Sequence, residues 1–132
     1  MIKFFSKYKV IFYFINVCLI FLYLFPGSIF GCIFLDDCKR QPQITPDLAI
    51  ISSNHFYAFL IISIIGFSTY SKKKDLKFLI IYLILSSILL EILHLVIPER
   101  SFQWSDLIGN FMAVIVVIFI YNLINKYGVF KK

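Results

Sequence analysis

The stretch FLIIYLILSSILLEILHLVI, residues 78–97, decides the fold class of this chain. It is almost continuously apolar and ends at Pro98. A helix needs about 20 mostly apolar residues to cross the hydrocarbon core of a bilayer. A lone strand would leave its backbone groups unpaired in lipid, so only a helix is compatible with one isolated span. The stretch therefore predicts a transmembrane helix.

Three other segments have the same character. Together with the first they predict transmembrane helices over about residues 8–25, 49–70, 76–97 and 106–124. The composition agrees, because 61% of the residues are hydrophobic and 15% are charged, whereas soluble proteins have about 45–50% and about 25%. The length of 132 residues suits one domain. We therefore predict an all-α, polytopic membrane protein of about four helices, with residues 1–132 as a single domain.

The basic residues predict the orientation. Ten of the 13 fall on one side of the predicted bundle: Lys3, Lys7, Lys9, Lys72, Lys73, Lys74, Lys77, Lys126, Lys131 and Lys132. Only Lys39, Arg40 and Arg100 fall on the other side. Short loops rich in Lys and Arg stay cytoplasmic. We expect a multi-pass protein of the cell inner (cytoplasmic) membrane, with cytoplasmic N- and C-termini and a cytoplasmic 71–77 loop.

The 26–48 loop and the 98–105 turn are then expected outside. Clustering of lysines beside apolar segments favours this topological interpretation of the net charge of +6 over nucleic-acid binding. Cys32 and Cys38 fall in the outer loop, where a disulfide and two free thiols are both open alternatives. The first segment also resembles a cleaved signal, but Phe30 stands where a small residue is usual, so an uncleaved helix is expected.

Six polar residues that are costly to bury in a membrane fall at one depth, near the outer face of the predicted bundle: His55, Glu91, His94, Arg100, Asp106 and Asn110. Glu91 and His94 are three residues apart, so they share one helix face. Asp106 and Asn110 are four residues apart and also share a face. A short turn joins the last two predicted helices, so their polar faces can meet each other and His55. An ionised carboxylate at a helix centre costs about 2.5–3.5 kcal/mol. Glu91 is therefore predicted to face the interior and to pair with Arg100 through two hydrogen bonds, with Asp106 competing for the same guanidinium.

Four pieces of sequence carry a family resemblance: HFYAF at 55–59, EILH at 91–94, PERSF at 98–102, and Asp106 with Asn110. In this order and spacing the chain resembles the VanZ-like family of integral membrane proteins, over about residues 50–125. It departs at His94, where the family usually has Gln, and at Ala113, where it usually has Gly. The resemblance implies a four-helix membrane protein. The namesake of the family is associated with low-level resistance to the glycopeptide teicoplanin.

From these residues we expect an extracytoplasmic-side site that binds or processes an anionic envelope lipid or glycan precursor. The predicted binding residues are His55, Glu91, Arg100, Phe102, Asp106 and Asn110. Arg100 would bind a phosphate or carboxylate, while Phe102 and Trp104 would pack at the membrane interface. The bilayer is the expected partner, and self-association or a larger membrane partner is left open. No cofactor and no metal are predicted.

Three alternatives remain. In an enzyme, His55 or His94 would act as general base, Glu91 or Asp106 would orient it, and Arg100 would stabilise an anion. In a metal site, the Glu91-x-x-His94 spacing would present ligands inward with His55 and Asp106, although Arg100 would repel a cation. In a structural or accessory subunit, the polar cluster would only staple helices together.

Overall fold

The computed structural model describes residues 2–70 and 73–127, with side chains over 8–70 and 74–127. This part of the chain forms five helices: α1 (Ile2–Leu24), α2 (Ile29–Phe34), α3 (Ser53–Thr69), α4 (Lys73–Leu93) and α5 (Trp104–Tyr127). Its only β-type pairing is one bridge between Leu48 and Ile51. The predicted all-α class is confirmed. Six lysine side chains used to predict the orientation lie outside the described residues: Lys3, Lys7, Lys72, Lys73, Lys131 and Lys132.

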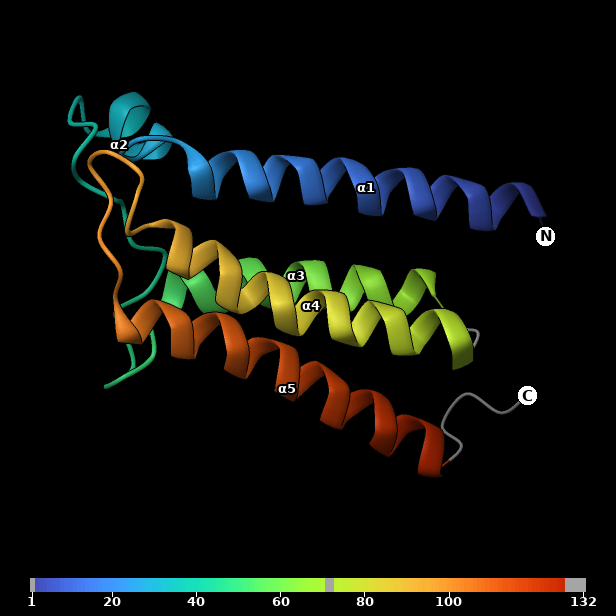
Figure 1. Ribbon diagram of the computed structural model, residues 1–132. Helices are drawn as coiled ribbons and strands as arrows, with labels where there is room; N and C mark the ends of the chain where they lie inside the picture. The colour runs from blue at the N-terminus through green and yellow to red at the C-terminus, as the bar shows by residue number, and fades with distance from the viewer. Residues whose placement is uncertain (1, 71–72, 128–132) are drawn as a thin grey trace.

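The four long helices run side by side, and successive ones are antiparallel (Figure 1). Helices α3 and α5 share the most extensive contact, and α1 lies along the outside against α3 and α4. The start of α1 and the end of α5 lie at one end of the bundle, while α2 and the loop that precedes α5 gather at the other (Figure 1). We call this second end the loop end.

Among the described residues, two helices are long and apolar enough to cross a membrane, over Lys74–Leu93 and Trp104–Tyr127. Two shorter apolar stretches are Tyr8–Leu24, the part of α1 whose side chains are described, and Ser53–Thr69. Large apolar side chains point outward over the bundle, and Phe14, for example, is 68% exposed. The structure thus gives two candidate spans among the four predicted segments.

Helix α3 begins at Ser53, four residues later than predicted, because the preceding segment folds into a tight turn. Ala49 has a positive φ of 49°, and Leu48 and Ile51 bond to each other through their backbones. Asp47 Oδ1 accepts the N–H of Ser53 at 2.9 Å, which satisfies a donor that a helix start leaves unpaired. His55 is therefore the third residue of α3 rather than two turns inside it.

Helix α4 is shifted towards the N-terminus relative to the prediction of 76–97. It begins at Lys73, inside the predicted 71–77 loop, and ends at Leu93. The N–H groups of the next three residues, 94–96, bond to carbonyls three residues earlier, which tightens the chain ahead of Pro98. His94 thus lies just beyond α4 rather than in its last turns.

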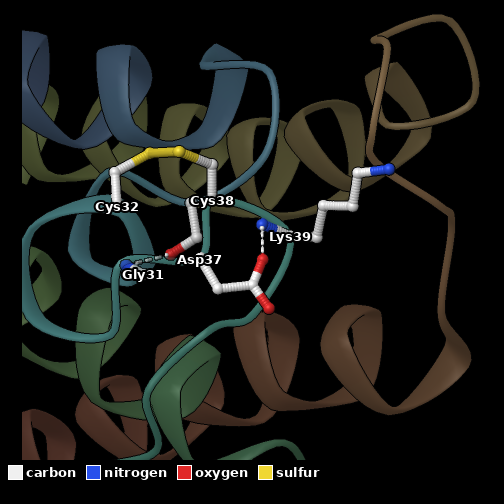
Figure 2. The surroundings of a disulfide bond; sticks show 6 residues. Gly31, Cys32, Asp37, Cys38 and Lys39 are labelled. Atoms are coloured by element: carbon white, nitrogen blue, oxygen red, sulfur yellow. Dashed lines mark hydrogen bonds between the residues drawn. A yellow bond between two sulfur atoms is a disulfide. The ribbon is translucent and has the colours of Figure 1, made fainter.

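Helix α2, which was not predicted, is part of a tight loop closed by a disulfide between Cys32 and Cys38 (Figure 2). The sequence left a disulfide and two free thiols as alternatives, and the structure contains the disulfide. A side chain at Gly31 would collide with the Arg40 carbonyl oxygen, so the loop packs closely on itself. Asp37 Oδ1 accepts the backbone N–H of Lys39 at 3.0 Å in the same turn (Figure 2).

Candidate functional site

The predicted polar residues meet at the loop end of the bundle. Glu91 and Asn110 are 0% exposed, His94 is 2% exposed and His55 is 5% exposed. Asp106 lies in the first turn of α5, two residues after Trp104, with which the helix begins. We call these five residues the polar cluster. The clustering predicted from sequence is seen in the structure, but the pairing within it differs.

A residue that sequence reasoning missed, Tyr23 of α1, joins the polar cluster at its centre. Its hydroxyl donates to Asn110 Oδ1 at 2.6 Å and lies 3.3 Å from His55 Nδ1. Asn110 Nδ2 in turn donates to the Ser87 carbonyl at 3.3 Å, which fixes the orientation of the amide. Since the Tyr23 proton goes to Asn110, the Tyr23 oxygen is left to accept from His55, and Nδ1 carries the proton.

Tyr23 also orients the second imidazole, through its backbone. His94 Nε2 lies 3.0 Å from the Tyr23 carbonyl oxygen. A carbonyl oxygen only accepts hydrogen bonds, so Nε2 carries the proton. The other ring nitrogen, Nδ1, faces Glu91 Oε2 at 3.1 Å.

The two carboxylates of the polar cluster face the two imidazoles. Glu91 Oε1 accepts the backbone N–H of Gln103 at 3.0 Å. Glu91 Oε2 also lies 3.7 Å from His55 Nδ1, yet among the described residues it has no hydrogen bond of acceptable geometry. Asp106 Oδ2 lies 3.4 Å from His55 Nε2. His55 is therefore held between two carboxylates.

The predicted pairing of Arg100 with Glu91 is wrong. Arg100 donates from Nη2 to the Leu22 carbonyl at 2.9 Å and from Nε to the Phe25 carbonyl at 3.2 Å. These carbonyls end α1, where helix groups lack internal partners and carry the negative end of the dipole. Burial lowers the pKa of Arg100 from its ordinary value, but the guanidinium stays charged. Within the described residues Arg100 makes no ion pair with a carboxylate.

Two adjoining cavities open beside the polar cluster. The first, of about 280 Å³, is polar and is lined by Gly27, Ser28, Lys39, Gln41, His94, Glu99, Arg100, Ser101, Gln103 and Asp106. The second, of about 440 Å³, is mostly apolar, and its lining includes Leu22, Ile29, Phe30, Phe34, Ala58 and Ile61. They share four residues: Ser28, Gln41, His94 and Arg100. Phe102, predicted to bind, lines neither of these two cavities and instead stacks edge-on with Trp104 at 5.1 Å.

Comparison with known proteins identifies no relative: no family model, no curated protein and no solved structure matches this chain. The resemblance to the VanZ-like family stays a prediction. Function is therefore inferred from the geometry of the polar cluster and its cavities. Imidazole and carboxylate pairs of this kind can move a proton or hold a cation.

Proposed function

We propose that this chain is a VanZ-like protein that spans the inner (cytoplasmic) membrane four times, with the loop end outside. The bias of basic residues towards the other end supports this orientation. The Cys32–Cys38 disulfide lies at the loop end, and disulfides persist in oxidising compartments. Both observations favour an extracytoplasmic loop end.

At that end, the protein binds an anionic amphiphile of the envelope, either a lipid or a lipid-linked glycan precursor. The observation that carries this proposal is the pair of adjoining cavities, one polar and one apolar, with Arg100 in the wall of both. A phosphate or carboxylate would lie in the polar cavity beside Arg100 and Lys39. Its hydrocarbon part would lie against Phe30, Phe34 and Ile61 in the apolar cavity.

Arg100 retains donors for such a ligand. Two of its N–H groups bond to α1 carbonyls, out of the five that a guanidinium offers. Lys39 forms an ion pair with Glu99 at 3.6 Å, and both side chains are largely exposed. A pair of this kind contributes at most about 1 kcal/mol, so Lys39 can exchange Glu99 for a bound anion.

The residues of the polar cluster have two roles in this proposal: some line the cavities, and others support the cavity wall. His55, His94 and Asp106 line the cavities, whereas Glu91 and Asn110 are fully buried and cannot touch a headgroup without rearrangement. The two buried residues lie behind the side chains that line the cavities and hold those side chains in place. Their part in binding is to position the wall.

Lipid retention tests the proposal. Wild-type protein is equilibrated with micelles that contain equal amounts of phosphatidylglycerol and phosphatidylcholine and is examined by native mass spectrometry. We expect selective retention of phosphatidylglycerol, reduced about tenfold in Arg100→Ala because a charge-assisted hydrogen bond contributes about 1.5–3 kcal/mol, and reduced less in Lys39→Ala. Lys126→Ala, at the opposite end of the bundle, is the matched control. Equal retention of the two lipids by the wild type would contradict the proposal.

One observation favours a second candidate, a structural subunit in which the cluster staples helices. The bonds of Tyr23 connect α1 with Asn110 of α5 and with His94, just beyond α4. Under this alternative, Arg100→Ala lowers thermal stability while the lipids carried by the protein do not change. The same native spectra, recorded with a melting curve, separate the two candidates.

A further inference from the structure

Both imidazoles of the polar cluster turn a nitrogen lone pair towards a carboxylate oxygen. Hydrogen bonding to Tyr23 assigns the ring proton of His55 to Nδ1 and that of His94 to Nε2. In each neutral ring the other nitrogen is then an acceptor. His55 Nε2 faces Asp106 Oδ2 at 3.4 Å, and His94 Nδ1 faces Glu91 Oε2 at 3.1 Å. Two acceptors at such distances repel each other unless a cation lies between them.

That cation is either a proton on each ring or a metal ion. The Glu91 oxygen is 0% exposed and has no hydrogen bond of acceptable geometry within the described residues, so it is a buried negative atom aimed into the cluster. Ligand atoms of His55, Glu91 and Asp106 all lie within 4.8 Å of one another. Around a tetrahedral Zn²⁺, with bonds of about 2.0–2.2 Å, neighbouring ligand atoms are about 3.3–3.6 Å apart. The distance of 3.4 Å between His55 and Asp106 fits this geometry.

The surroundings suit a metal ion in two further respects. Histidines that bind metals almost always donate their other ring N–H to a carbonyl, carboxylate or water; here His94 meets the Tyr23 carbonyl and His55 meets the Tyr23 hydroxyl. Arg100, which as a neighbouring cation would oppose a metal, bonds to the α1 carbonyls instead of to either carboxylate. Two carboxylates balance the charge of one divalent ion.

We propose that the polar cluster binds one divalent transition-metal ion of the Zn²⁺ class, with His55, Glu91 and Asp106 as its protein ligands. Tyr23 is a positioning residue that presents the His55 ring. His94 Nδ1 lies beside the Glu91 ligand atom and can supply a further nitrogen ligand to the metal ion. Since Asp106 also lines the polar cavity, a coordination position can face that cavity. The site does not depend on lipid binding, so it can be tested alone.

The experiment uses full-length protein in detergent, treated with a chelator, dialysed, and titrated with Zn²⁺ alone. We expect one Zn²⁺ per chain by elemental analysis and native mass spectrometry, and a higher melting temperature with Zn²⁺ because a ligand of the folded state stabilises it. Absence of stoichiometric Zn²⁺ on folded wild-type protein overturns the proposal. The polar cluster would then consist of two buried imidazolium–carboxylate pairs without a metal ion.

Variants locate the site. Loss of a ligand in Glu91→Gln or Asp106→Asn should weaken Zn²⁺ binding by more than about 100-fold, because even an outer-shell change costs about 10–100-fold. Tyr23→Phe keeps the backbone carbonyl and should weaken binding about tenfold. Asp75→Asn, a carboxylate change in the first turn of α4, is the matched control and should bind as the wild type does. Zn²⁺ that survives both ligand substitutions would overturn the assignment, and Asp106→Asn serves if Glu91→Gln does not fold.

Discussion

The loop end and the middle of the bundle use the same pair of side chains, an amide and a phenol, in different ways. At the loop end, Tyr23 and Asn110 are buried and link α1 to α5. About halfway along α1 and α4, Tyr82 donates to Asn16 Oδ1 beside a cavity of about 490 Å³ that reaches Lys9 and Tyr70 near the other end. Tyr82 is 39% exposed, whereas Asn16 is buried, so only the phenol side of this bond lies at the periphery. The comparison indicates an interlocked loop end and looser packing where α1 meets α4 farther along the bundle.

Glycines show the same contrast. A side chain at Gly109, at the loop end, would lie 2.7 Å from the Ser52 carbonyl oxygen and 3.3 Å from the Phe56 nitrogen. At Gly66, in the part of α3 nearer the other end, the nearest atoms belong to the Leu79 and Phe12 side chains, at 3.0 Å. Backbone cannot move aside as a side chain can, so the close contact of α3 with α5 depends on the glycine at position 109.

The largest expected effect is that of Gly109→Ala. We expect it to lower the free energy of unfolding by about 2–3 kcal/mol, because overpacking against backbone forces the helices apart. Gly66→Ala is the matched change and should cost less than about 1 kcal/mol, since alanine also gains about 1 kcal/mol in helix propensity. Reversible unfolding in micelles measures both. Equal costs would mean that the two ends are packed with similar tolerance.

The next effect in size is that of Asn110→Ala, which removes the bonds to Tyr23 and to the Ser87 carbonyl. We expect a loss of about 2 kcal/mol, because each buried polar group left without a partner costs about 1–3 kcal/mol. The change should also release the His55 ring that Tyr23 orients. Unfolding in micelles, together with the nitrogen chemical shifts of His55, checks both. Unchanged shifts would show that Asn110 does not fix the hydrogen bond of Tyr23.

The smallest effect is expected for Asn16→Ala in the middle of α1. A hydrogen bond between membrane helices contributes about 0.6 kcal/mol on average, and half-exposed Tyr82 can find another partner when Asn16 is removed. We therefore expect a loss of about 0.6 kcal/mol. The same unfolding measurement applies, with Tyr82→Phe as the matched variant. A loss as large as that of Asn110→Ala would remove the distinction between the two regions.

The pairing within the site was beyond sequence reasoning in two places. Tyr23 gave no distinguishing signal, since a tyrosine near the end of an apolar segment is common at membrane interfaces; it lies 32 residues before His55 and 87 before Asn110. Arg100 was assigned to Glu91, whereas the end of α1 offered it unpaired carbonyls. Neither contact follows from spacing along one helix.

By itself, the sequence determined the all-α class, the positions of the apolar segments and the gathering of His55, Glu91, Asp106 and Asn110 at one depth. These follow from local properties, because hydropathy and helical spacing are set by neighbours along the chain. Only the tertiary structure decided which partner each polar group meets and where helices begin and end. Those choices depend on α1 docking against α3 and α4 and on unpaired backbone groups brought close by folding.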